Sequence, residues 1–239
     1  MNRIGRLLLV CALGMSCAGT SSAAGVASLN WDSCIGPISK TVLPGTAPSL
    51  YVSVLGHSAP HKAYDVRVQL YSQGHALADA WRFDAEGCQG TARIAIDHVP
   101  GGGGLPSCPA FMQSSAPSLQ IKTFTYDPLT GRARVLLANA YPNGVASANP
   151  VTRYFLARFT FDQAVGVNGA SNPGNTCGGL EVPVCFLALN ASWLSLDGIE
   201  TVWPLSSEFV AANTPEAGYC LGTPARATTW GSLKSQYRN

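Results

Sequence analysis

Six cysteines follow the N-terminal leader of this chain, and their redox chemistry is the clearest chemistry that the sequence offers. An even number of cysteines behind an export signal is typical of a disulfide framework in an oxidising compartment. We therefore expect all six to be oxidised and to pair with one another. They are Cys34, Cys88, Cys108, Cys177, Cys185 and Cys220.

Fifteen pairings of six cysteines are possible, and the sequence alone does not choose among them. Short loops favour Cys88 with Cys108 and Cys177 with Cys185, which leaves Cys34 to pair with Cys220. In the chain-entropy model the long loop stabilises the fold by roughly 4–5 kcal/mol and each short loop by roughly 2–3 kcal/mol. Structural zinc is disfavoured, because no histidine near these cysteines completes a ligand set. We expect no metal and no cofactor.

The leader is identified by its three regions. Two arginines precede an apolar run at residues 7–15, and small residues at 22–24 suit a signal peptidase. We expect cleavage after residue 24 and a protein that is secreted or at the cell surface. The alternative is a lipid anchor at Cys17, although the residues before it fit that motif imperfectly.

Other residues that could do chemistry have simpler interpretations. His57 and His61 stand four apart, but Pro60 between them favours a loop with solvated histidines over a pair of metal ligands. Asp79, Asp84 and Glu86 could furnish the paired carboxylates of a glycoside hydrolase. A solvated acidic turn before the next cysteine is the favoured interpretation.

No catalytic signature is present in the sequence. It contains neither a Gly-x-Ser-x-Gly elbow nor a His-Glu-x-x-His pair. Residues 168–175 offer amide and carbonyl oxygens but no carboxylate, so a plain loop is favoured over a calcium site. Residues 101–104, four glycines, are interpreted as a loop between strands. We therefore expect no catalytic residues and a protein that is not an enzyme.

Composition excludes several other classes. Charged residues make up only 12% of the chain, and the leader holds two of the basic residues and none of the acidic ones, so the remainder is electrically balanced. Nucleic acid is not an expected partner, since phosphate binding needs clustered Lys and Arg. No apolar run after the leader is long enough to span a membrane.

Alternation with a period of two dominates the rest of the chain. Tyr64, Val66, Val68 and Leu70 alternate with polar residues, which predicts a strand with one buried face. Residues 153–162 alternate in the same way, with Phe155, Ala157, Phe159 and Phe161 on one face. Further strands are expected at residues 50–55, 91–99, 120–126, 133–138, 184–189, 193–196 and 199–203.

These short strands, separated by turn signals, predict an all-β fold. We expect an antiparallel β-sandwich of the Ig-like or jelly-roll kind, held by disulfides, in a single secreted domain at residues 25–239. Helix is expected to be minor, as short turns at residues 76–81 and 207–212.

Five tryptophans are each large enough to stack on a sugar ring or to anchor a protein interface. Trp81 and Trp193 have apolar neighbours and are expected in the core, whereas Trp203, followed by a proline, is expected nearer an edge. No regular aromatic row indicates a polysaccharide groove. A carbohydrate-binding module is therefore a second hypothesis without direct support.

Three segments in order resemble the middle of a cohesin-type domain. Residues 124–128 form an aromatic-Asp-Pro turn, residues 130–140 lead to a small-polar-small triplet, and residues 154–161 follow a surface loop. The likeness covers about residues 48–200 and implies a β-sandwich, similar also to carbohydrate-binding modules. It implies a protein-binding face without identifying it.

The chain also resembles an uncharacterised family of secreted bacterial proteins, through residues 31–34, 79–88, 177–185 and 229–231. That likeness carries no function. From the cohesin likeness and the lack of a catalytic set we expect a secreted, noncatalytic binding or structural domain whose partner is another extracellular protein. The alternatives are a carbohydrate-binding module that takes polysaccharide and, less favoured, a glycan-active hydrolase.

Overall fold

The computed structural model describes residues 25–57, 59–98, 108–111, 117–145, 149–163, 177–207, 209–214 and 219–220. The expected leader at residues 1–24, the alternative anchor Cys17, and the loops at 101–104 and 168–175 lie outside this part of the chain. Within it, regular structure is β except for two 3-10 turns, η1 (Asp79–Trp81) and η2 (Thr91–Arg93). No helix in the described ranges is long and apolar enough to cross a membrane.

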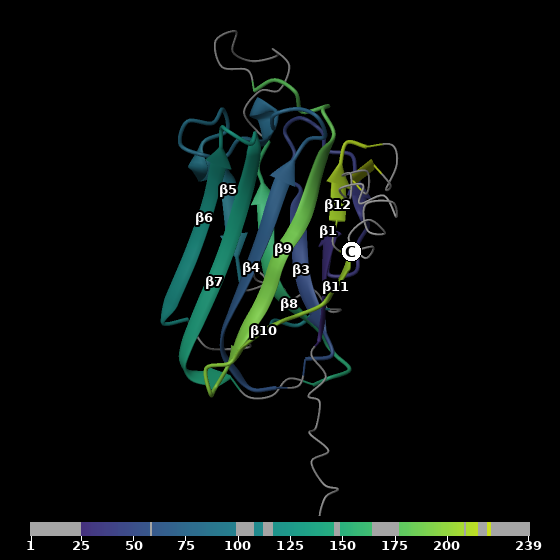
Figure 1. Ribbon diagram of the computed structural model, residues 1–239. Coiled ribbons are helices and arrows are strands. Elements are labelled where there is room, and N and C mark those ends of the chain that lie inside the picture. Colours follow the sequence, from purple (N-terminus) through teal and green to yellow (C-terminus); the bar gives the residue numbers. More distant parts are fainter. Residues whose placement is uncertain are drawn as a thin grey trace, which may run out of the picture.

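Two sheets make up the fold (Figure 1). The first has five strands in the order β11-β1-β3-β8-β5. Its neighbours are antiparallel, except that β11 pairs with β1 in parallel. The strands are β1 (Val26–Trp31), β3 (Ser49–Leu55), β5 (Ile94–Asp97), β8 (Arg153–Phe161) and β11 (Leu205–Ser207).

The second sheet has the order β2-β12-β9-β4-β7-β6, and β10 pairs with β9 beside this path. Only β2 and β12 pair in parallel. The strands are β2 (Ser39–Lys40), β4 (His61–Tyr71), β6 (Leu119–Asp127), β7 (Arg132–Val145), β9 (Val184–Ser195), β10 (Glu200–Val202) and β12 (Phe209–Ala212).

The core lies between the two sheets and draws on both. Alternation in β4 buries Tyr64, Val66, Val68 and Leu70, as predicted. Aromatic rings meet edge-on in the middle of this core, including Trp31 against Phe186 with ring centroids 5.0 Å apart. The expected class, an all-β antiparallel sandwich held by disulfides, is confirmed.

Strand β8 departs from the predicted alternation. Val52 of β3 pairs with Ala157 while Ser53 pairs with Phe155, so Leu156 is an extra residue in a β-bulge. The bulge turns Phe155 away from the main core, where Ala157 and Phe159 lie, into a separate cluster with Tyr51 and two cysteines. The prediction that Phe155 shares a face with Ala157 is therefore wrong, because alternation holds only where no residue is inserted.

Three element boundaries also differ from expectation. The strands expected at 184–189 and 193–196 are one strand, β9, because pairing with β4 continues across residues 190–192. Residues 209–212 form β12 instead of part of a helical turn, since β9 provides a partner along their whole length. Strand β5 begins only at Ile94, after the η2 turn.

All six cysteines are in disulfides, but none of the expected pairings is correct. The bonds join Cys34 to Cys108, Cys88 to Cys177 and Cys185 to Cys220. The predicted pairings assumed that cysteines close in the sequence pair with each other. The true partners are 74, 89 and 35 residues apart, because the sheets bring distant segments together. Backbone hydrogen bonding illustrates this, since Ala80, near Cys88, donates to the carbonyl of Gly178, next to Cys177.

Candidate functional site

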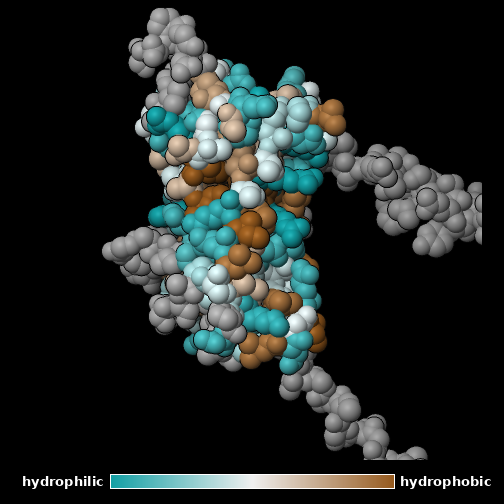
Figure 2. All heavy atoms as spheres, turned by 90° about the vertical axis from the view of Figure 1, so that its left-hand side faces the viewer, coloured by the Kyte–Doolittle hydropathy of each residue, from teal (hydrophilic) through white to brown (hydrophobic). Residues whose placement is uncertain are grey.

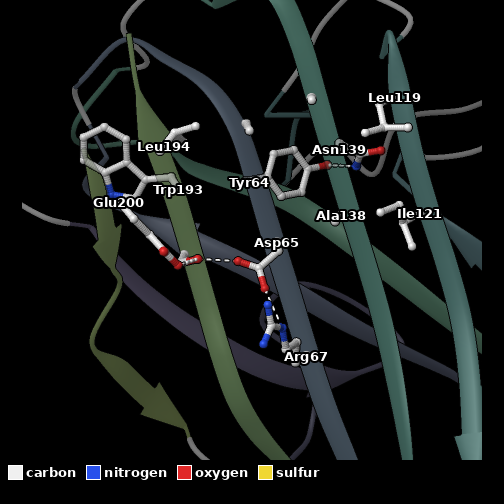
Figure 3. Close-up of a pocket in the computed structure, with 13 residues that line it drawn as sticks. Tyr64, Asp65, Arg67, Leu119, Ile121, Ala138, Asn139, Trp193, Leu194 and Glu200 are labelled. Carbon is white, nitrogen blue, oxygen red and sulfur yellow. Dashed lines mark hydrogen bonds and ion pairs between the residues drawn. The ribbon is translucent and has the colours of Figure 1, made fainter. Parts of the chain in front are cut away.

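The outer face of the second sheet is hollowed over β4 and β7 (Figure 3). Strand pairing aligns two rows of side chains across this face. On each strand the member of one row is two residues from the member of the other, so both rows point to the same side of the sheet. One row is Glu200, Leu194, Ala63, Ala140 and Leu119, and the other is Val202, Ser192, Asp65, Ala138 and Ile121. The hollow, called the outer-face groove below, has a volume of about 280 Å³.

The floor of the outer-face groove is made of alanines. Ala63, Ala138 and Ala140 each present only a methyl group, so the floor stays close to the backbone of β4 and β7. Leu119 and Ile121 of β6 rise beside it and are 58% and 42% exposed. Exposed aliphatic side chains gathered around a hollow are typical of an interaction site.

Charged groups lie at one end of the outer-face groove. The Ser192 hydroxyl lies between two carboxylates, within hydrogen-bonding distance of Asp65 and 2.9 Å from Glu200 Oε1, and its single proton is donated to one of them at a time. Arg67 Nε lies 2.8 Å from the other oxygen of Asp65, and its side chain is largely exposed. This end therefore carries two carboxylates and one guanidinium, with Glu200 free of a salt bridge among the described residues.

A buried polar network holds the strands beneath the groove. The hydroxyl of Tyr64 donates to the carbonyl of Leu156 in the opposite sheet and accepts a hydrogen bond from Asn139, both at 2.9 Å. Gln120 of β6 in turn donates to Asn139 Oδ1 at 2.8 Å and to His98 Nδ1 at 2.7 Å. Burial raises the pKa of Tyr64 well above its ordinary value, so the phenol stays protonated and keeps both bonds. The network links β4, β7 and β6 into a stable base.

The two histidines that the sequence placed in a solvated loop are buried. His57 is 1% and His61 0% exposed, and their rings meet edge-on with centroids 5.2 Å apart. Phe111 stacks on His61, and Trp203 Nε1 donates to His57 Nδ1 at 3.2 Å. The prediction of solvated histidines is wrong because aromatic residues from distant segments, Phe111 and Trp203 among them, pack over the two rings. Trp203 is likewise fully buried and not at an edge.

The histidine cluster touches the groove from below. Trp193, which lines the groove, packs edge-on against His57 with centroids 4.8 Å apart. Burial lowers the pKa of both histidines from 6.5 to about 4, and the charge of His57 adds to the effect at His61, while the Ala59 backbone opposes it. Both rings are therefore neutral at pH 7.

The acidic residues that the sequence singled out do not form a catalytic pair. Asp84 accepts hydrogen bonds from Arg82. Burial raises the pKa of Asp84, but the hydrogen bonds and charge of Arg82 outweigh that effect, so the pKa lies below its ordinary value. Asp79 and Glu86 are exposed. None of the three lines the outer-face groove.

Sequence reasoning missed the groove, although two signals point to it. In β6 the apolar residues switch parity, from Leu119 and Ile121 at odd positions to Phe124 and Tyr126 at even ones. Such a switch marks a strand with apolar side chains on both faces. The other signal is small residues at alternate positions of β7, Ala138 among them, where a solvated face usually carries longer polar side chains.

These features define a class of protein: a disulfide-linked antiparallel β-sandwich with an apolar groove on the outer face of one sheet. No protein-family model matches the chain, and no curated protein matches it.

Solved structures that are similar to the chain are cohesin modules, the type named from the sequence. One is the second type II cohesin module of the cellulosomal adaptor ScaA scaffoldin of Acetivibrio cellulolyticus, with a TM-score of 0.39, 8% identity and coverage of 81% of this chain and 99% of that chain. Another is the cohesin module of a Clostridium perfringens family 33 glycoside hydrolase. Its TM-score is 0.36 and its identity 10%, and the match covers 80% of this chain and 97% of that chain. A third is a non-cellulosomal cohesin from the archaeon Archaeoglobus fulgidus. Its TM-score is 0.33 and its identity 9%, and the match covers 78% of this chain and 89% of that chain. At these values the likeness describes the arrangement of strands only.

Proposed function

We propose that this chain is a secreted, noncatalytic protein-binding domain that contacts its partner through the outer-face groove. The observation that carries the proposal is the pair of exposed aliphatic residues, Leu119 and Ile121, beside a floor of alanines. Covering them removes apolar surface from water, which is worth about 25 cal/mol per Å². The three disulfides support an oxidising compartment.

The dimensions of the groove suit an α-helix. Neighbouring strands are about 4.8 Å apart, so β6 and β9, which flank β7 and β4, are separated by roughly 14 Å. A helix with its side chains is roughly 10–12 Å across and fits between these strands. An extended segment has no hydrogen-bonding partners on a sheet face, because the backbone groups of inner strands are already paired.

The charges of the groove favour a basic residue on the partner. Asp65 and Glu200 outnumber Arg67, and a Lys or Arg beside Glu200 would complete a second ion pair. Complementary charge of this kind contributes to specificity and association rate more than to affinity. The partner that fits is therefore an amphipathic helix with small or aliphatic residues on one side and a cation near one end.

Neither alternative function has comparable support. Carbohydrate-binding modules stack sugars on exposed aromatic rings. In the described ranges no Trp, Tyr or Phe is exposed. For a hydrolase, the outer-face groove offers the carboxylates of Asp65 and Glu200, but Asp65 is bound by Arg67 and the intervening Ser192 is only 2% exposed.

A binding experiment tests the proposal. The mature protein is used to capture extracellular proteins of the producing organism, and each captured protein is identified, expressed and titrated. We expect Ile121→Asp to weaken binding at least about tenfold, equivalent to about 1.4 kcal/mol, because a carboxylate replaces a buried contact. Leu129→Asp is the matched control, since Leu129 is 96% exposed at the tip of the β6–β7 turn, outside the groove.

The same variants are tested against a polysaccharide panel and a glycan hydrolase screen. Equal effects of Ile121→Asp and Leu129→Asp on protein binding would contradict the groove as the contact surface. Binding or turnover of a glycan without any protein partner would contradict the function itself.

A further inference from the structure

Both sheets end on the same side of the molecule. Strand β6 pairs only with β7, and β5 pairs only with β8, among the residues that the structure describes. Figure 1 places the two strands together at the left, and Figure 2 views that side, where apolar residues gather between polar ones. An edge strand leaves the N–H and C=O groups of alternate residues unpaired, which is a template for a further strand.

A notch separates the two edges. It has a volume of about 380 Å³, and Ile94 and Ile96 of β5 line one side while Phe124 of β6 lines the other. Ile96 and Phe124 contact the main core from here. The notch is therefore an apolar extension of the core that opens at the edge of the sandwich.

One charged residue stands in the notch. Lys122 lies between Gln120 and Phe124, which both face the interior, so strand alternation directs Lys122 the same way. Within the described ranges no carboxylate pairs with it. An inward-pointing charge at an edge strand discourages indiscriminate pairing, because an added apolar strand would have to cover an unpaired cation.

We propose that β6 accepts an extended segment of a partner protein as an added strand, with apolar side chains in the notch and a carboxylate beside Lys122. Among the described residues only β7 pairs with β6, and the backbone groups at the other edge of β6 pair with an extended segment and not with a helix. Lys122 specifies the acidic residue, because only a carboxylate turns the unpaired cation into an ion pair. The surface is separate from the outer-face groove, since Leu119 and Ile121 point from the same strand to the opposite side.

A second copy of this chain is a poorer occupant. An antiparallel β6–β6 pair would bring the Lys122 side chains of both copies to one face of the joined sheet, and like charges close together on one face are destabilising. Strand β6 has nine residues, which gives an added segment a full-length partner.

The test uses a capped nine-residue peptide in which alternate residues, the ones that face the notch, are valine, except that the central one is glutamate. Its affinity for the mature protein is measured by calorimetry, and amide exchange of β6 is followed by NMR. We expect protection of alternate β6 amides and a rise in the pKa of His98, which burial and the charge of Lys122 now lower. Methylation of alternate peptide nitrogens should abolish both effects, since it removes the donors that pair with β6.

Charge reversal provides the matched control. Lys122→Glu should lower the affinity for the glutamate peptide about tenfold. It should raise the affinity for a peptide with lysine in place of the glutamate by a similar factor. Binding that ignores both N-methylation and Lys122→Glu, or a saturated complex without protection of β6 amides, would overturn the proposal. Ile121→Asp distinguishes this site from the outer-face groove, because Ile121 lines the groove and not the notch. The variant should bind the peptide unchanged. Loss of peptide binding would place the peptide in the groove and overturn the edge site.

Discussion

At the scale of single residues, the buried histidine pair is the least expected feature. His57 is held as a neutral ring because burial disfavours its charged form, and its Nδ1 accepts a hydrogen bond from Trp203. A proton added at Nδ1 would face the Trp203 N–H and break that bond. Besides each other, the rings that the two histidines contact in the described ranges are those of Phe111, Trp193 and Trp203, which carry no negative charge to offset a protonated ring.

The free energy of unfolding should therefore fall in mild acid. Both folded pKa values are about 4, below the ordinary 6.5, so between these values the unfolded chain binds protons that the folded chain excludes. Stability is fully present above about pH 6.5 and is lost as the pH falls toward 4. We expect a loss of about 2 kcal/mol for each histidine, so on the order of 4 kcal/mol for the pair, between pH 7 and pH 5, measured from urea unfolding midpoints.

Two variants isolate the origin of this loss. His61→Phe keeps an aromatic ring against Phe111 but cannot titrate, so its stability should depend less on pH. His75→Phe replaces an exposed histidine and should leave the pH dependence of the natural chain unchanged. Identical pH profiles for all three proteins would show that the histidine pair is not responsible.

At the scale of elements, the β-bulge in β8 decides which side of a sheet a large side chain covers. Leu156 is the inserted residue, and it sends Phe155 to the outer face of the first sheet. There Phe155 packs on Tyr51, with ring centroids 5.9 Å apart, beside the Cys34–Cys108 bond. The outer face of this sheet is thus partly covered by the segments that the disulfide joins.

Phe155→Ala should destabilise the protein by about 3 kcal/mol even though the residue is on the outer side of its sheet. The reason is that Phe155 is only 1% exposed, so its removal leaves a cavity under the Cys34–Cys108 bond. Leu55→Ala, also on an outer face but 38% exposed, should cost less than about 1 kcal/mol. Urea unfolding of both variants measures the difference, and similar costs would mean that the cluster adds little to stability.

At the scale of the whole molecule, the disulfides connect segments that the sheets bring together. Cys88–Cys177 spans 89 residues and Cys185–Cys220 spans 35. Non-reducing peptide mapping should recover these two pairs and Cys34–Cys108, with no free thiol among the six. Recovery of a peptide that joins Cys88 to Cys108 would contradict the structure.

Removal of one bond tests its contribution to stability. In the chain-entropy model, replacing both Cys88 and Cys177 by Ser should lower the free energy of unfolding by about 4–5 kcal/mol, and the corresponding change at Cys185 and Cys220 by about 4 kcal/mol. Thermal unfolding of the two variants measures the order. A larger loss for the shorter loop would show that native contacts, and not loop length, set the effect.

The sequence by itself determined the fold class and much of the core. Alternation is a local property, since successive side chains on a strand point to opposite faces wherever the strand pairs. For that reason Tyr64, Val66 and Leu70 were placed correctly in the core, and strands β3, β4, β6 and β10 were located within a few residues. The expectation that all six cysteines are oxidised followed from their number and the leader, and needed no partner assignments.

Only the tertiary structure decided the disulfide partners, the burial of His57 and the outer-face groove. Each depends on residues that are far apart in the chain and meet through strand register or packing between sheets. Ala63, Ala138 and Leu194 form one hollow because β4 pairs with both β7 and β9, and no local pattern encodes that order. A single inserted residue, Leu156, likewise reversed the face of Phe155, because register is a property of two strands and not of one.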